Sequence, residues 1–226
     1  MKKGVKVLLT IVCIILALVL IVIIGARIYF RGPSKEYYKH SEKAFKIPDI
    51  DNDFIPQGIT FNEADNCFLV TGYMKDDSSN PIYVLDKDGN LINKVLLNNR
   101  DGSAFHCHAG GISIYNNYVY MAGCQDCTLY VFSYSNIKNN TNAISLGEFS
   151  TKVSDNDFTT IYDGKIVLGE FFREENYQTL PSHKINTNGG DYNQAIALVY
   201  ELGDYEDTYG INPEPQFAYS IKDLVQ

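Results

Sequence analysis

The sequence has few positively charged residues. It contains 19 Lys and Arg residues and 27 Asp and Glu residues, which give a formal net charge of −8. A protein that binds nucleic acid needs a basic face for the phosphates, so this balance argues against such a partner. The G-x-S-x-G pattern of a serine nucleophile is also missing. Beyond Asp53 the chain shows no convincing helical periodicity, whereas short strand-like runs are frequent.

One long uncharged run, residues 7–26, is present near the start of the chain. About twenty apolar residues are enough to cross a bilayer as a helix. The alternative is a cleaved signal peptide, whose apolar region is typically about 7–15 residues and ends at a small-x-small site. We therefore expect a short cytoplasmic tail over residues 1–6 and one transmembrane signal-anchor helix over residues 7–30. The C-terminal part then lies outside the cell membrane.

The next segment, residues 31–52, is polar and is interrupted by Pro33 and Pro48. Such a composition is typical of a stalk or linker. We expect the exported domain to begin at residue 53 and to run to residue 226.

This exported part contains a repeat, which starts with QGITFNEADNCFLVTGY (57–73), GGISIYNNYVYMAGC (110–124) and DFTTIYDGKIVLGEF (157–171). Each copy reads as a strand, a tight polar turn and a second, apolar strand. Four-stranded units that repeat every 50 residues or so indicate an all-β fold of the β-propeller type, with an open β-sandwich as the alternative. The predicted third strands are 81–86, 128–134 and 195–202, and the predicted fourth strands are 91–97, 143–149 and 216–221.

About three antiparallel blades are predicted, over residues 53–105, 106–154 and 155–224. Propellers usually have four to eight blades, so the ring is expected to be incomplete. The chain is then a truncated reading frame, a fragment, or a protein that completes its ring by assembly. Exposed strand edges pair readily with other chains, so self-association through the open blade edges is one expectation.

Four stretches, PQGITF, HAGGISIYNNYVYMAG, FTTIYDGKIVLGEF and LPSH, resemble bacterial secreted or membrane-anchored β-propeller proteins. These are related in architecture to the six-bladed lactonase, arylesterase and strictosidine-synthase-like propellers. The resemblance covers about residues 53–226. It implies a calcium site in the central channel for lactonase-type members, formed by Glu, Asn and Asp at the strand starts. Gln57, Gly110 and Asp157 hold the equivalent places, and only Asp157 has suitable chemistry, which puts calcium-dependent lactonase activity in doubt.

The segment FHCHAGG and the following C-x-x-C raise the question of a metal or disulfide. In a blade, the start of the first strand and the end of the second lie at one face, so these side chains should cluster there. A zinc site of His106, His108, Cys124 and Cys127 has the right number of ligands but not the usual spacing. A disulfide among Cys107, Cys124 and Cys127 suits an oxidising exterior. A thioredoxin-like redox role needs the C-x-x-C at a helix start, whereas here it follows a strand, and structural thiols are the fourth interpretation. No cofactor is predicted, and calcium or zinc stays an alternative.

The chemistry of the exported part is expected at the mouth of the channel. The long insertion 172–194 is hypothesised to cover this mouth, since long loops in compact folds are often functional. We predict a membrane-anchored module that binds a ligand or protein partner rather than an enzyme. A metal-dependent hydrolase of the lactonase or arylesterase type is the alternative, and a truncated chain without independent function is the third. The candidate ligand-binding residues are Gln57, His106, His108, Asp157, Glu170 and His183.

Overall fold

The computed structural model describes residues 3–32, 34–123, 127–190 and 192–221. The chain divides into two compact units, Met1–Ala44 and Phe45–Gln226. The first unit holds the helices α1 (Lys3–Arg31) and α2 (Lys35–Lys39). Within α1, Gly4–Phe30 is long and apolar enough to cross a membrane, and none of it is buried inside the protein. This helix has the length and composition of a membrane anchor or of a signal sequence.

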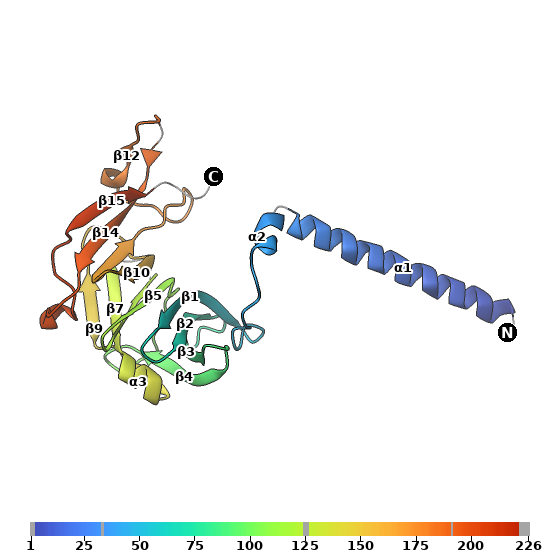
Figure 1. Ribbon diagram of the computed structural model, residues 1–226, viewed down its shortest axis with the longest axis horizontal. Coiled ribbons are helices and arrows are strands. Elements are labelled where there is room, and N and C mark those ends of the chain that lie inside the picture. The colour runs from blue at the N-terminus through green and yellow to red at the C-terminus, as the bar shows by residue number, and fades with distance from the viewer. Residues whose placement is uncertain (1–2, 33, 124–126, 191, 222–226) are drawn as a thin grey trace. The chain divides into compact units, whose positions relative to one another are not determined.

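The second unit consists of three antiparallel sheets that follow one another along the chain as blades of a β-propeller (Figure 1). Blade 1 has the order β1-β2-β3-β4, blade 2 the order β5-β6-β7-β9, and blade 3 the order β10-β11-β14-β15. The strands of blade 1 are β1 (Phe54–Asn62), β2 (Cys67–Met74), β3 (Pro81–Asp86) and β4 (Leu91–Asn98). Those of blade 2 are β5 (Gly111–Tyr115), β6 (Tyr118–Ala122), β7 (Thr128–Ser133) and β9 (Gly147–Ser150). Those of blade 3 are β10 (Phe158–Tyr162), β11 (Lys165–Gly169), β14 (Ala195–Glu201) and β15 (Phe217–Ile221).

The predicted hairpins are confirmed in all three blades, and their turns follow from the local sequence. Between β10 and β11, Asp163 and Gly164 both have positive φ, which a tight type I′ hairpin turn requires. Between β1 and β2, the Asn62 side chain accepts a hydrogen bond of 3.0 Å from the amide of Ala64. Such a side chain replaces a backbone partner in the turn. The polar turns therefore set the register of each hairpin.

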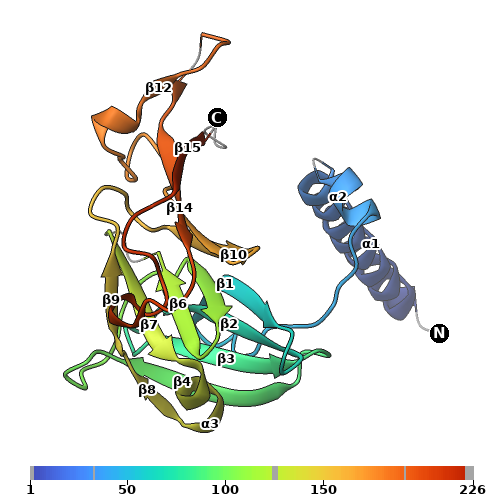
Figure 2. The same cartoon turned by 60° about the vertical axis from the view of Figure 1, so that its left-hand side comes forward.

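Both faces of blade 2 are buried, because successive residues of a strand point to opposite sides. On β6, Val119 and Met121 belong to the apolar core shared with blade 1, whereas Tyr120 and Ala122 belong to the core shared with blade 3. This packing explains why the blade strands are almost continuously apolar rather than alternating. Figure 2 shows the blades from a second side.

Two elements differ from the sequence prediction. A helix, α3 (Tyr134–Asn139), follows β7, and Ser133 caps it by accepting a hydrogen bond from the amide of Asn136. The helix has 6 residues, of which Tyr134 and Ile137 are buried. A segment this short does not show a clear helical period in the sequence. The predicted fourth strand 143–149 is divided: β8 (Asn142–Ile144) pairs in parallel with β4 of blade 1, and β9 completes blade 2.

The segment that precedes β1 covers the outer face of blade 1. The buried residues Phe54, Val70, Tyr83 and Leu85 form an apolar cluster with Phe45 and Ile47 packed against it. We call this cluster the capped face. The Asp49 carboxylate accepts hydrogen bonds of 2.8 Å from the Tyr83 hydroxyl and of 2.8 Å from Lys94 Nζ. Residues 45–52, which the sequence pattern assigned to the stalk, therefore lie within the β unit.

Smaller elements complete the described chain and lie between the blade strands. A two-stranded sheet, β12 (Ile185–Asn186) with β13 (Tyr192–Asn193), forms in the long insertion of blade 3. The 3₁₀ helices are η1 (Pro181–His183) and η2 (Glu206–Thr208).

Candidate functional site

The innermost strands of the three blades, β1, β5 and β10, approach one another closely. At Gly111 a Cβ atom would lie 2.6 Å from the amide nitrogen of Thr159, which leaves no space for a side chain. The hydroxyl groups of Ser113 and Thr159 are 3.0 Å apart and join β5 to β10. Gly110 and Gly111 therefore permit the close packing of the inner strands.

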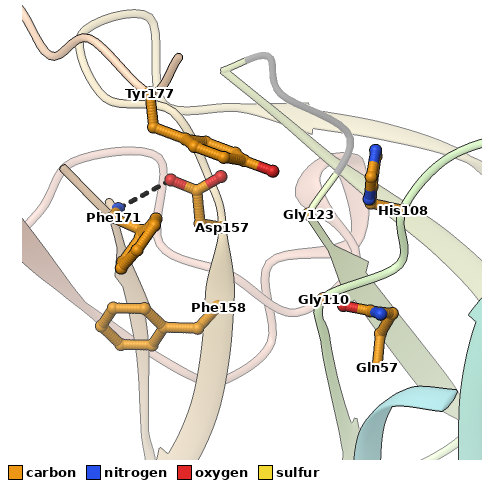
Figure 3. A pocket seen from close by; sticks show the side chains of 8 residues that line it. All are labelled: Gln57, His108, Gly110, Gly123, Asp157, Phe158, Phe171 and Tyr177. Carbon is orange, nitrogen blue, oxygen red and sulfur yellow. Dashed lines mark hydrogen bonds between the residues drawn. The ribbon is translucent and has the colours of Figure 1, made fainter. Parts of the chain in front are cut away.

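A cavity of about 340 Å³ opens where these inner strands begin. Figure 3 shows that Asp157, Phe158 and Phe171 stand on one side of it and that His108 and Gln57 stand on the other. The Tyr177 ring lies above Asp157 and directs its hydroxyl group into the space between the two sides (Figure 3). We call this cavity the mouth pocket. Its lining residues are Gln57, His108, Gly110, Gly123, Asp157, Phe158, Phe171 and Tyr177.

Asp157 is the charged group of the mouth pocket. It is half-buried, and one of its oxygens accepts a hydrogen bond of 2.7 Å from the amide of Phe171. Burial raises the pKa of Asp157 above the usual 3.8, the Phe171 amide opposes this rise, and the charge of Asp155 adds to it. None of the ion pairs among the described residues includes Asp157. Among the described residues this half-buried carboxylate therefore has no ion-pair partner.

Aromatic rings form much of the rest of the wall. The rings of Phe171 and Tyr177 meet edge to face, with centroids 5.3 Å apart. On the opposite side His108 packs on Tyr73 at 5.1 Å. The insertion 172–194 supplies Tyr177, so one of its side chains does reach the mouth of the channel.

Glu170 and His183 form a buried pair close to the pocket. His183 Nδ1 lies 2.8 Å from one carboxylate oxygen of Glu170, and the amide of Ile196 donates to the other at 3.0 Å. Burial raises the pKa of Glu170, while the Ile196 amide and His183 oppose the rise and Asp155 adds to it. Because His183 ends η1 within the insertion, this pair ties the insertion to the second strand of blade 3.

The cysteines of the opening motif have separate environments. Cys107 is disulfide-bonded, and its sulfur accepts a hydrogen bond of 3.2 Å from the amide of Ala109. The Cys127 thiol donates a weak hydrogen bond to Asp155 at 3.7 Å. Cys124, a candidate for both the disulfide and the zinc site, lies outside the described residues. Within the described ranges there is no group of three or more His, Cys, Asp or Glu side chains that could hold a metal ion.

The six predicted ligand-binding residues fall into three sets. Gln57, His108 and Asp157 line the mouth pocket. Glu170 and His183 are buried against each other instead, and His106 is exposed and does not line the pocket.

The prediction left out the aromatic residues of the pocket. Phe158 and Phe171 flank the hairpin of the third repeat, where an apolar side chain reads as part of the core. Their position at a strand start and after a strand end was the only signal that could have placed them at the mouth.

Comparisons with solved structures identify similar β-propeller folds at low sequence identity. Sqt1 from Chaetomium thermophilum is 13% identical, with a TM-score of 0.40 over 75% of this chain and 36% of that chain. Hsv2p from Kluyveromyces lactis is 14% identical, with a TM-score of 0.36 over 73% of this chain and 47% of that one. The β-propeller domain of Cps50 (Swd1) from Myceliophteria thermophila is 11% identical, with a TM-score of 0.36 over 76% and 58%.

This chain therefore spans between about a third and three fifths of those propellers. No protein-family model matches the sequence, and no curated protein matches it.

Proposed function

We propose that the chain is a membrane-anchored, extracytoplasmic β-propeller module that binds an organic cation, such as a substituted ammonium group, in the mouth pocket. The observation that carries this proposal is the carboxylate of Asp157, which lies in a cavity walled by aromatic rings and has no ion-pair partner among the described residues. A buried charge is costly unless an opposite charge accompanies it.

The aromatic wall supports the same ligand chemistry. Ammonium groups are attracted to the faces of Tyr and Phe rings within about 6 Å of the ring centroid. Tyr177 and Phe171 stand beside Asp157, so one bound cation would contact both kinds of group (Figure 3). The formal net charge of −8 further favours the approach of a cation.

Titration calorimetry of the full chain in detergent with tetramethylammonium chloride tests this function. The expected result is saturable binding, which Asp157→Asn weakens by about tenfold or more, or about 1.4 kcal/mol. Lowering the pH should also weaken binding, because protonation removes the charge of Asp157. This loss should begin above pH 3.8, since burial raises the pKa of Asp157, and Asp157→Asn should abolish it.

Matched controls make this result specific. The Glu175→Gln variant removes an exposed carboxylate of the same insertion that does not line the pocket, so its affinity should equal that of the parent. Neutral tert-butanol, similar in size to the cation, should not bind measurably. Absence of binding, or equal weakening in both carboxylate variants, would refute the cation site.

The apolar helix α1 and the disulfide at Cys107 support the proposed location. Disulfides persist in oxidising compartments outside the cytoplasm. A membrane-impermeant amine reagent added to intact cells should label lysines of the β unit, such as the exposed Lys87. Protection of those lysines until the membrane is opened would place the β unit in the cytoplasm.

A metal-dependent hydrolase is the second candidate function, with Asp157, Glu170 and His108 as its polar groups. Burial is the main cause of the raised pKa values of Asp157 and Glu170, and the charge of Asp155 adds to both, so three acidic side chains of this region are close enough to influence one another, which favours this candidate. Elemental analysis of the purified full chain separates the candidates. Stoichiometric calcium or zinc, lost in Asp157→Asn, would favour the hydrolase.

A further inference from the structure

Each face of blade 2 packs against a neighbouring blade. Among the described residues, one sheet face of blade 3 has no neighbouring blade packed on it. Registers identify its side chains, because residues directly opposite each other on paired strands point to the same side. One row across the sheet consists of Thr160, Val167, Val199 and Phe217. The next row consists of Phe158, Gly169, Ala197 and Tyr219. We call these two rows the open face.

The matching row of blade 2 shows what such a face does within the fold. It consists of Ser113, Tyr120, Val131 and Gly147, and it is buried against blade 3. Tyr120 and Val131 are 0% exposed, and Phe149 on the same face is 5% exposed. On the open face Ala197 and Val199 of the middle strand β14 are each 7% exposed, but Phe217 and Tyr219 of the outer strand β15 are 52% and 57% exposed. The open face therefore corresponds to the face of blade 2 that packs on blade 3, but its large aromatic side chains are exposed to solvent.

The opposite end of the β unit is not a ready partner for the open face. The outer part of blade 1 is the capped face, which Phe45 and Ile47 cover. Ile59 and Phe61, near the inner edge of blade 1, are 54% and 41% exposed, and Leu91 and Leu96 on β4 are 52% and 40% exposed. A ring closed by blade 1 of another copy would first have to displace the segment that carries Phe45 and Ile47.

The open face is, however, complementary to itself. Consider a two-fold axis that runs parallel to the strands in front of the open face, midway between β11 and β14. This axis sets β11 of one copy opposite β14 of the other, and β10 of one copy opposite β15 of the other. It places Phe158 of one copy opposite Tyr219 of the other. At the end of the face Lys165 and Glu201 are cross-strand neighbours, and the same axis sets Lys165 opposite the second copy's Glu201. Neither residue forms an ion pair among the described residues.

We propose that the open face is the docking surface of a second copy of this chain, which packs face to face through blade 3 across this two-fold axis. Two-fold dimers with self-complementary interfaces are the commonest protein oligomers. The aromatic side chains supply the apolar contact, and the Lys165–Glu201 pairs fix the register, since opposite charges across an interface select orientation.

Light scattering of the full chain in detergent, corrected for the micelle, tests the proposal. The parent protein should have twice the 25.5 kDa protein mass of one chain at micromolar concentration. The double variant Phe217→Ser/Tyr219→Ser should be monomeric. The control Ile59→Ser/Phe61→Ser removes two apolar side chains that are also largely exposed, but at the other end of the β unit, and should remain dimeric.

Charge variants provide a test that does not depend on the aromatic residues. Lys165→Glu should raise the dissociation constant of the dimer at least tenfold, and adding Glu201→Lys should restore it. A cooperative thermal unfolding transition in each monomeric form shows that the variants fold. A monomeric parent protein, a dimer that survives Phe217→Ser/Tyr219→Ser, or a dimer that Ile59→Ser/Phe61→Ser abolishes would each overturn the proposal.

Discussion

The capped face of blade 1 and the open face of blade 3 are the two ends of the same series of sheets, yet they differ in burial. On the capped face Phe54 and Tyr83 are 0% exposed, because the preceding segment packs on them. On the open face Phe217 and Tyr219 are more than half exposed. A blade strand has two apolar faces wherever it lies, so the outer face at each end of this series needs a covering element. Blade 1 has such a segment in its own chain, and blade 3 has none among the described residues.

The largest expected difference between the two ends comes from shortening one aromatic side chain at each. Phe54→Ala should lower the free energy of unfolding by about 3–5 kcal/mol, because it leaves a cavity in a closed cluster. Phe217→Ala should change it by less than about 0.5 kcal/mol in the monomer, since the ring is largely exposed. Urea unfolding at low protein concentration measures both. Equal losses would show that the open face is covered within the monomer.

A second, smaller effect concerns the contact that fixes the insertion 172–194 to blade 3. His183→Ala leaves Glu170 buried without its ring partner, and an unsatisfied buried group costs about 1–3 kcal/mol. Hydrogen exchange should then increase in residues 181–186. The exposed His106 is the matched control, and His106→Ala should leave both the stability and the exchange unchanged. Unaltered exchange in His183→Ala would show that the pair does not fix the insertion.

The smallest effect is expected at Asp49, which fastens the covering segment of blade 1. Asp49→Asn should cost about 1 kcal/mol at pH 7, the typical net value of a hydrogen bond. The hydrogen bond from Lys94, followed by that from Tyr83, lowers the pKa of Asp49 below 3.8. The native state therefore binds fewer protons at Asp49 than the unfolded state. The difference in free energy of unfolding between the parent protein and Asp49→Asn is complete above pH 3.8 and is lost as the pH falls through the lowered pKa of Asp49.

Urea unfolding of the parent protein and of Asp49→Asn between pH 7 and pH 3 measures this difference. Asp163→Asn, in the exposed turn between β10 and β11, is the control and should show no such pH dependence. A difference that grows towards pH 3 would contradict the assigned role of Asp49.

Local pattern was sufficient to predict the hairpins and most blade strands, because turn residues such as Asp163 and Gly164 specify the reversal directly. It assigned residues 143–144 to the fourth strand of blade 2, whereas they belong to β8, since pairing with β4 depends on where blade 1 lies and not on the local sequence. Gln57 and Asp157 were predicted to lie at the channel mouth because the repeat gives them equivalent positions at the strand starts, and His108 because it directly precedes the first strand of the second copy. Phe171 was missed because an aromatic residue after an apolar strand has the same local signature in a core and in a pocket.

The sequence by itself determined the apolar N-terminal helix, the polar turns and the repeat of four strands, all of which follow from side-chain polarity at short range. Only the tertiary structure decided that His183 is buried on Glu170, that Phe45 and Ile47 cover blade 1, and that Phe217 and Tyr219 stay exposed. The physical reason is that the burial of a side chain depends on which distant segment packs on it. Similar four-stranded units at the two ends of this series of sheets therefore have different surfaces.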